Sequence, residues 1–204
     1  MKITEQIKQY EYILFDLGGV LIDIDYHATT SAFANLNVPN FDEIYSQALQ
    51  TDLFDRFETG KISSQHFINL LLEKLPTRIT PNEVVSAWNA MILDFQPKKI
   101  TYLESLRSSH KISLLSNTND IHMDKVRRKL KLVSDKSLED YFDFTFLSQE
   151  IGYRKPEAAA FQLVCETLNA KPNEILFIDD SEQHIIGAQQ VGMNTIHFKQ
   201  NEPF

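Results

Sequence analysis

From residue 111 onward, short apolar runs alternate with segments whose apolar residues recur at helical spacing, and this alternation limits the possible folds more than any other feature. Short strands separated by helices form a parallel sheet with helices on both faces. We therefore predict an α/β fold with a Rossmann-like parallel sheet. The expected strands are Lys111–Leu115, Phe144–Leu147, Ile175–Ile178 and Thr195–Phe198, and the expected helices are Asn119–Leu130, Glu157–Leu168 and Glu182–Val191.

The sequence YILFDLGGVLID, at residues 12–23, supplies a first strand for the same sheet. Its apolar run, Ile13–Phe15, ends abruptly at Asp16, and Gly18 and Gly19 follow. Open α/β sheets bind ligands at the carboxyl ends of their strands, and glycines let the backbone turn freely there. Asp16 is therefore a candidate functional residue.

A long block after this strand has a different character. The region Ile24–Phe95 has no convincing strand pattern, but it has several helical ones, and Ser63 is the expected N-cap of the clearest. Pro97 is expected to open a further helix. We predict a core domain of residues 1–23 and 97–204, with a helical domain of residues 24–96 inserted after the first strand. The expected helices of this insertion are Ala28–Leu36, Phe41–Phe54, Ser63–Leu75 and Pro81–Leu93.

Composition narrows the choice of partners and compartment. The net charge of −8 argues against nucleic acid or an anionic membrane as the main partner. A single cysteine, Cys165, excludes an internal disulfide and lies on an apolar helix stripe, where core packing is expected. No apolar run reaches membrane-spanning length, and Met1–Glu11 is too polar for a signal peptide, so we expect a cytoplasmic protein. The basic run Lys125–Lys131 is expected to be a solvated helix face.

Four groups of polar side chains lie at the ends of the expected elements, three after strands and one before a helix. Taken singly, each has an ordinary explanation, because Thr118, Asn119 or Ser181 would cap a following helix and Pro156 is a normal first helical residue. Parallel strands, however, bring their carboxyl ends to one rim of the sheet. The groups that meet there are Asp16, Ser116-Asn117-Thr118, Arg154-Lys155-Pro156 and Asp179-Asp180.

The chemistry of this rim favours phosphoryl transfer. Asp16 and Asp180 can share Mg²⁺, which prefers one or two carboxylates together with water and substrate phosphate. Ser116 supplies a hydroxyl donor, and Lys155 supplies a positive charge for an anion. An ionised carboxylate, a metal and an anion-binding cradle are the groups needed to transfer a phosphoryl group to aspartate.

With these motifs in place, the chain resembles the haloacid dehalogenase superfamily of aspartate-nucleophile phosphatases over nearly its whole length. FDLGGVL, LLSNT, YRKPE and FIDDS resemble the four motifs of that superfamily, in the same order. The inserted helices resemble its helical cap. The segments DRFETGKIS, LSNTN and LSQEIGYRKPE resemble the bacterial α-D-glucose-1-phosphate phosphatase branch, and the phosphatase domain of bifunctional epoxide hydrolases is a more distant likeness.

The resemblance implies a role for each matching residue. Asp16 would be the nucleophile that forms an aspartyl-phosphate, and Lys155 would neutralise charge in the transition state. Ser116 and the Asn117 amide would bind phosphate oxygens. Mg²⁺ would be held by Asp16, the backbone carbonyl of Gly18 and Asp180, with Asp179 as a further ligand or a support.

Gly18 departs from the superfamily pattern, in which most phosphatases carry an aspartate that protonates the leaving oxygen and activates water. His184 also stands where relatives often carry Asn or Asp. We expect Asp23 and Asp25 to be solvated turn residues, although either could reach the site through water and would, with His27, be a first candidate for a substitute acid. Trp88 is expected in the core of the insertion rather than as a platform for a sugar.

The expected function is a Mg²⁺-dependent phosphatase acting on a small phosphorylated metabolite, such as a sugar 1-phosphate. Two alternatives remain. Dehalogenases of the superfamily also lack the aspartate, but they work without a metal, which leaves the pair Asp179-Asp180 unexplained. A weakly active regulatory protein that binds a phosphometabolite is the other. We expect a monomer or a homodimer.

Overall fold

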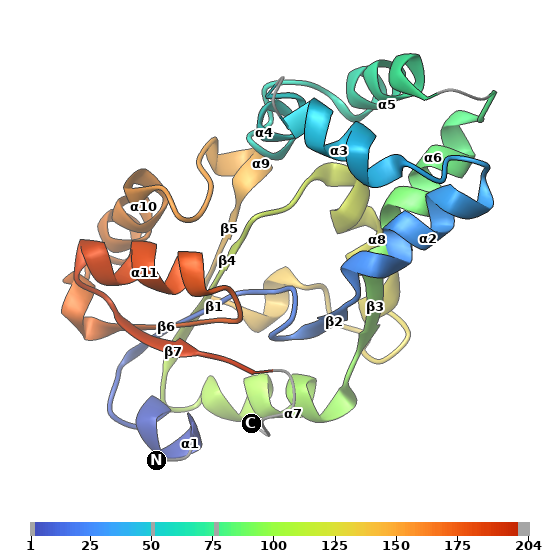
Figure 1. The fold of residues 1–204 in the computed structure, drawn as a ribbon. Coiled ribbons are helices and arrows are strands. Elements are labelled where there is room, and N and C mark those ends of the chain that lie inside the picture. Colours follow the sequence, from blue (N-terminus) through green and yellow to red (C-terminus); the bar gives the residue numbers. More distant parts are fainter. Residues whose placement is uncertain (1–2, 50–51, 76–77, 200–204) are drawn as a thin grey trace.

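A five-stranded parallel sheet lies at the centre of the computed structural model, which describes residues 3–49, 52–75 and 78–199 (Figure 1). The strand order is β5-β4-β1-β6-β7, and β1 is paired on both edges. The predicted α/β fold is confirmed, and each strand begins and ends within one residue of its expected position. The strands are β1 (Tyr12–Phe15), β4 (Lys111–Ser116), β5 (Phe144–Leu147), β6 (Ile175–Asp179) and β7 (Asn194–His197).

Side chains of the central strand alternate between two hydrophobic cores, as expected for a sheet covered on both faces. Ile13 and Phe15 contribute to one core, and Leu14 contributes to the other. The first core is covered by α1 (Ile3–Ile7), α7 (Pro97–Leu106) and α8 (Asp120–Leu130). The second is covered by α10 (Ala158–Leu168) and α11 (Glu182–Val191), and Cys165 packs against it as predicted. A short helix, α9 (Ser148–Ile151), follows β5.

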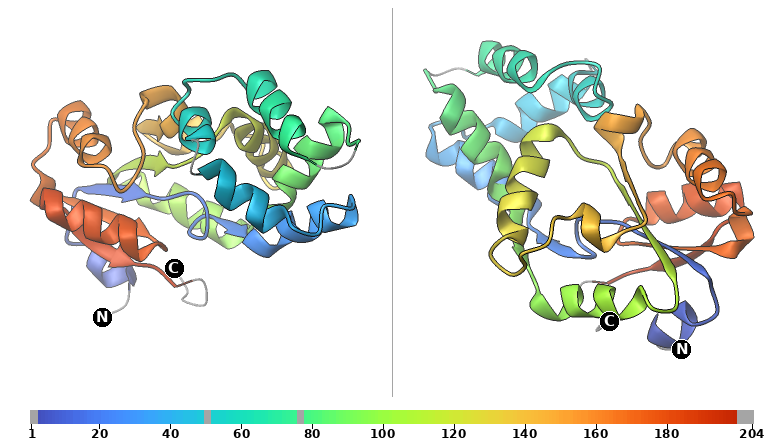
Figure 2. Two further views of the ribbon diagram at one scale, coloured as in Figure 1. Left: turned by 45° about the horizontal axis from the view of Figure 1, so that its top comes forward. Right: turned by 180° about the vertical axis from the view of Figure 1, so that it is seen from behind.

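In the part of the insertion that the structure describes, five α-helices lie between the first strand and α7, beside one end of the sheet (Figure 2). The insertion has an aromatic core of its own, in which Phe54 stacks on Trp88 with ring centroids 5.3 Å apart. The core position predicted for Trp88 is confirmed. The helices are α2 (Tyr26–Asn35), α3 (Phe41–Leu49), α4 (Leu53–Glu58), α5 (Ser64–Lys74) and α6 (Pro81–Trp88). The domain boundaries at residues 24 and 96 stay a prediction.

Local sequence explains where several helices begin. Ser63 caps α5 by accepting a hydrogen bond from the His66 N–H, as predicted, and Asn119 caps α8 in the same way through His122. The helix expected over Phe41–Phe54 is instead two helices, α3 and α4. Asp52, just before α4, has a φ of 54°, which is incompatible with a continuous helix.

The absence of strands predicted between Ile24 and Phe95 is wrong at the end of this region. β2 (Ile22–Ile24) and β3 (Ile92–Phe95) pair in an antiparallel two-stranded sheet that connects the insertion to the rest of the chain. The helix expected to run to Leu93 ends at Trp88, and a 3₁₀ turn over Asn89–Met91 follows. Ile92 lies at helical spacing from Val84 and Trp88, so the local pattern predicts a helix there. The strand forms because β3 pairs with β2, which is distant in sequence.

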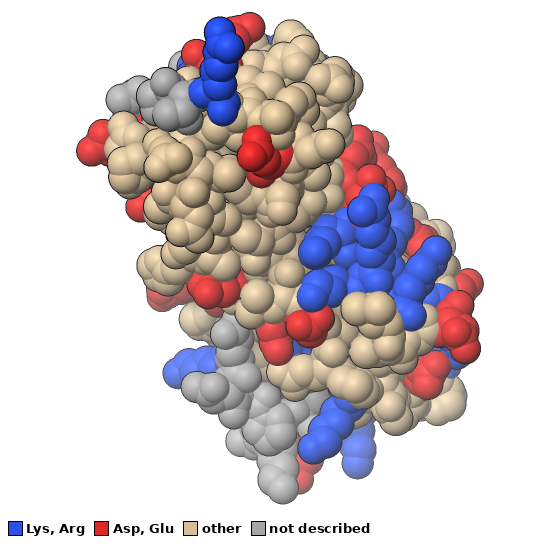
Figure 3. Space-filling view, turned by 90° about the vertical axis from the view of Figure 1, so that its right-hand side faces the viewer, with Lys and Arg blue, Asp and Glu red and all other residues tan. Residues whose placement is uncertain are grey.

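Basic side chains gather on one face of the molecule, over α8 (Figure 3). Two of them are engaged by acidic residues, because Arg127 donates to Glu139 at 2.9 Å and Lys129 donates to Asp94 at 2.7 Å. These contacts agree with the solvated helix face expected over Lys125–Lys131. Among the described helices, none combines the length and the apolar character needed to cross a membrane.

Candidate active site

The carboxyl ends of three adjacent strands bring the predicted groups to one rim. Asp16 follows β1, and its backbone N–H still donates to the Ile178 carbonyl at 2.9 Å. Ser116 is the last residue of β4, and Asp179 is the last residue of β6. Because β1 lies between β4 and β6, these three residues meet at the centre of the sheet.

Lys155 connects two carboxylates at this rim. Its side chain is buried, and Nζ donates to Asp16 Oδ1 at 2.6 Å and to Asp179 Oδ2 at 2.7 Å. Burial disfavours the ammonium form, but the two carboxylates outweigh this effect and raise the pKa of Lys155 above its ordinary value. The lysine is therefore a fixed positive charge beside Asp16.

Asp179 is completely buried and has donors on both oxygens. Oδ1 accepts the Ser181 N–H at 2.7 Å, and His184 Nδ1 lies 3.1 Å from each oxygen. Burial alone would raise the pKa of Asp179, but Lys155 and His184 hold it well below its usual range. The His184 departure noted in the sequence thus supplies a hydrogen-bond partner for Asp179.

Positive charge offsets the burial of Asp16 less completely than it offsets the burial of Asp179. Burial, opposed by Lys155 and reinforced by Asp179 and Asp180, raises the pKa of Asp16 to about 7. Burial and the adjacent Asp179 also raise the pKa of Asp180. The rim therefore holds more negative charge than its single lysine offsets.

The three carboxylates fit a divalent cation. One oxygen from each of Asp16, Asp179 and Asp180 lies within 4.8 Å of the other two, and oxygen donors at this density suit a hard ion such as Mg²⁺. The turn after β1 is shaped around Asp180. Gly19 has a φ of +74°, and a Cβ there would lie 1.9 Å from Asp180 Oδ2, so this position requires glycine.

Asn117 has a contact that the sequence did not indicate. Its side-chain Nδ2 donates to the Lys155 carbonyl at 2.8 Å, and its Oδ1 accepts the Lys155 N–H at 2.8 Å. The side-chain amide is thus committed to positioning the lysine. A phosphate contact from Asn117 stays a prediction and would fall to its backbone N–H.

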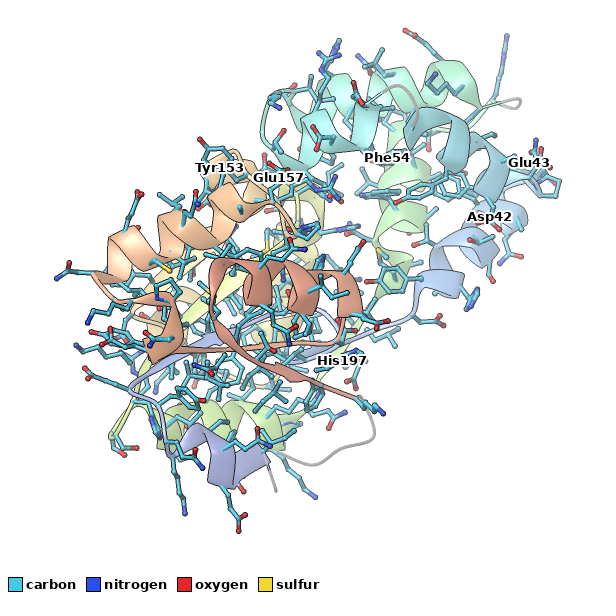
Figure 4. All side chains as sticks on the ribbon, turned by 60° about the vertical axis from the view of Figure 1, so that its left-hand side comes forward. Asp42, Glu43, Phe54, Tyr153, Glu157 and His197 are labelled. Atoms are coloured by element: carbon cyan, nitrogen blue, oxygen red, sulfur yellow. The ribbon has the colours of Figure 1, made fainter. Side chains whose placement is uncertain are left out.

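A cavity of about 770 Å³ opens above the rim and reaches into the insertion. Glu157, just before α10, and Asp42, on α3, both line it and lie well apart in Figure 4. The rim contributes predicted site residues to the lining, namely Asp16, Gly18, Ser116, Asn117, Lys155 and Asp180. Sequence reasoning missed the contribution of the insertion and its neighbours, which includes Tyr45, Glu58 and His122.

The two acidic residues near the entry to the insertion do not share this cavity. Asp23 accepts hydrogen bonds from Gln96 at 2.8 Å and from Lys99 at 3.2 Å, and Asp25 is the N-cap of α2. Both are absent from the described residues that line the cavity, whereas His27 is among them.

Comparison with known proteins gives a consistent family. Residues 10–192 match the family model of the haloacid dehalogenase-like hydrolases. The D-ribitol-5-phosphate phosphatase of Bacteroides thetaiotaomicron is 32% identical over 183 residues, which cover 90% of this chain and 89% of the relative. The glyceraldehyde 3-phosphate phosphatase of Pyrococcus furiosus is 26% identical over 207 residues, covering 95% and 82%.

A solved structure agrees with the sequence matches. The HAD family enzyme of Bacteroides thetaiotaomicron, in complex with magnesium and inorganic phosphate, aligns with a TM-score of 0.87 and 34% identity, covering 96% of this chain and 97% of that one. The resemblance to the superfamily that the four sequence motifs indicated is confirmed by these matches.

Proposed function

The chain belongs to the haloacid dehalogenase-like hydrolases, and from this premise we propose that it is a Mg²⁺-dependent phosphatase acting on a small sugar or polyol phosphate. The observation that carries the proposal is the buried Lys155, held between Asp16 and Asp179 at 2.6 and 2.7 Å. This contact fixes a positive charge beside Asp16, which both lines the cavity and is hydrogen-bonded to Lys155. Relatives named as phosphatases of phosphorylated metabolites support it.

Asp16 is the proposed nucleophile. Its carboxylate attacks the substrate phosphorus, the ester P–O bond breaks, and the phosphoryl group becomes an aspartyl-phosphate. The leaving oxygen departs with the bonding electron pair as an alkoxide and takes a proton from water. Water then attacks that phosphorus, releasing inorganic phosphate and restoring Asp16. Lys155 neutralises charge as the phosphoryl group transfers, and Ser116 with the Asn117 backbone N–H binds the phosphate oxygens.

Mg²⁺ would be held by Asp16, the Gly18 carbonyl and Asp180. Bound there, it would neutralise phosphate charge and favour the ionised form of Asp16, whose pKa is otherwise raised to about 7. Asp179 already has donors on both oxygens, so we assign it to positioning Lys155 and His184. A structural neighbour solved in complex with magnesium and inorganic phosphate supports the choice of Mg²⁺ as the ion.

Because residue 18 is a glycine, it has no acidic side chain to protonate the leaving oxygen. We propose that this favours leaving groups that are stable as anions, such as anomeric sugar 1-phosphates. Asp23 and Asp25 are engaged in other hydrogen bonds, so His27, which lines the cavity, is the better candidate for a substitute acid. A primary ester such as D-ribitol 5-phosphate would depend most on such a group.

The proposal extends to the organisation of the protein. Residues 24–96 would act as a cap domain that controls water access and selects the leaving group, with residues 1–23 and 97–204 as the core domain. We also propose a cytoplasmic location and a monomeric or homodimeric state. The net charge of −8 and the acidic rim support a small metabolite rather than nucleic acid or a membrane as partner.

Metal removal tests this function. The purified protein should hydrolyse p-nitrophenyl phosphate and members of a sugar phosphate panel with Mg²⁺, and EDTA should stop turnover until Mg²⁺ is restored. Turnover that persists in EDTA, with halide release from a 2-haloacid, would instead identify a metal-independent dehalogenase. Binding of phosphometabolites without hydrolysis would indicate the regulatory alternative.

A further inference from the structure

Three buried polar atoms without a hydrogen-bond partner belong to residues that line the cavity. They are Trp88 Nε1, Arg154 Nε and Glu58 Oε2, and none has such a partner among the described residues. An unmatched buried polar group is costly to a fold, so several residues that carry such atoms and line one cavity point to a ligand. Two of these atoms are donors and one is an acceptor.

Glu58 and Arg154 approach each other across the junction between the insertion and the sheet. Glu58 is the last residue of α4, and Oε2 lies 2.7 Å from Arg154 Nη2, an ion pair that lacks the alignment of a hydrogen bond. Only 17% of the Glu58 side chain is exposed, and burial raises its pKa although Arg154 opposes this. A close backbone contact keeps α4 in place, since a Cβ on Gly60 would lie 2.1 Å from the Gln149 carbonyl of α9.

The ion pair of Arg154 and Glu58 is connected to the rim through the chain itself. Arg154 directly precedes Lys155, so that their Cα atoms are about 3.8 Å apart. Lys155 reaches the rim, while the Arg154 guanidinium reaches Glu58 in the insertion. Tyr45 also lines the cavity and packs against Phe54 of α4, with 4.5 Å between ring centroids. A group bonded to a phosphate on Asp16 would therefore extend toward this cluster.

We infer that Glu58, Arg154 and Trp88 form a subsite for the hydroxyl groups of a polyhydroxylated leaving group. The inference rests on the proposed phosphatase function and assigns its specificity. A hydroxyl both donates and accepts, so the hydroxyls of such a group can donate to the Glu58 carboxylate and accept from the Arg154 and Trp88 N–H groups. An alkyl chain could form none of these hydrogen bonds, and sites of this kind discriminate strongly against analogues that lack the hydroxyl.

A purely structural role for the ion pair is the competing explanation. Arg154 also lies 3.4 Å from Asp55, which is on the same helix as Glu58 but does not line the cavity. Asp55→Asn is therefore a matched control for Glu58→Gln. Each substitution removes one negative charge facing Arg154, but only Glu58 lines the cavity.

The test compares D-ribitol 5-phosphate with n-pentyl phosphate, two primary esters that differ in their hydroxyl groups. Glu58→Gln should lower kcat/KM for the ribitol ester by about 10-fold or more while changing that for the pentyl ester less than about twofold. Trp88→Phe, which removes the indole N–H but keeps an aromatic ring, should act in the same direction. Asp55→Asn should leave both substrates within about twofold of the unmodified protein.

Three outcomes are informative. Equal losses on both esters in Glu58→Gln and Trp88→Phe would overturn the subsite and leave a structural contact. A thermal melt and p-nitrophenyl phosphate turnover identify a variant that fails to fold, and Arg154→Lys then provides the same comparison through a different residue. If the unmodified protein hydrolyses no phosphate ester, the proposed function fails, and the subsite fails with it.

Discussion

The rim of the sheet and the helical insertion contribute to one cavity in different ways. At the rim, Lys155 donates to Asp16 and Asp179 through its ammonium group and is held by the Asn117 side chain through its backbone, in hydrogen bonds of 2.6 to 2.8 Å. On the side of the insertion, Trp88 Nε1 and Glu58 Oε2 are buried without a hydrogen-bond partner among the described residues, although Glu58 is ion-paired with Arg154. A rim organised before substrate arrives suits charge stabilisation, because the cost of orienting its groups is already met. Unmatched groups suit recognition of a particular substrate.

The largest effect is expected where the rim is tested directly. Asp16→Asn should lower kcat by at least about 10⁴-fold, because an amide of the same size is not a nucleophile. The fold should persist, since Lys155 keeps its contact with Asp179 and one carboxylate is removed from a crowded site. Steady-state kinetics and a thermal melt measure the two effects. Undiminished turnover in this variant would remove Asp16 from the mechanism.

The rim was also the more predictable region. Asp16, Ser116 and Asp179 each end an apolar run, so local pattern and the rules of parallel sheets locate them together. The clamp of Asn117 on Lys155 joins positions 38 residues apart, and no local pattern encodes it. The roles of these residues stay predictions.

The insertion was less predictable for a related physical reason. Its helices could be read from spacing and caps, because those signals lie within each helix. The orientation of Glu58 toward Arg154 depends on how α4 packs against segments distant in sequence. The pairing of β3 with β2 also joins distant segments. Sequence reasoning therefore finds the chemistry more readily than the specificity.

A smaller effect is expected from restoring an acid at Gly18. The native protein should show a steep dependence of kcat/KM on leaving-group acidity across aryl phosphates, and an aspartate should raise the rate on the poorest leaving groups by about 10²-fold. A Cβ on Gly18 would lie 3.1 Å from Ile24 Cγ1, so Gly18→Asp is best made with Ile24→Ala. Ile24→Ala alone is the control. A flat dependence in the native protein would mean that a substitute acid already operates, and His27→Gln would then identify or exclude it.

The smallest effect concerns His122, where the two regions touch. The ring stacks on Trp88 with centroids 5.3 Å apart, and Nε2 lies 3.2 Å from the Trp88 carbonyl while Nδ1 lies 3.2 Å from the Asn119 side-chain nitrogen. The neutral tautomer that satisfies both contacts carries its proton on Nε2, donates to the carbonyl and accepts from Asn119. A second proton would displace the Asn119 donor.

Burial lowers the pKa of His122 to about 4 from its ordinary 6.5, so the native state binds fewer protons than the unfolded chain between these values. Its contribution to stability is present above pH 6.5 and is lost as pH falls toward 4. His122→Gln keeps a donor and an acceptor but does not titrate. The stability of the native protein relative to this variant should fall by about 2 kcal/mol between pH 7.5 and 4.5, measured by urea unfolding without metal. The same substitution at the exposed His66 is the control. If the difference in unfolding free energy between the native protein and His122→Gln stays constant with pH, protonation of His122 does not affect the contact between the two regions.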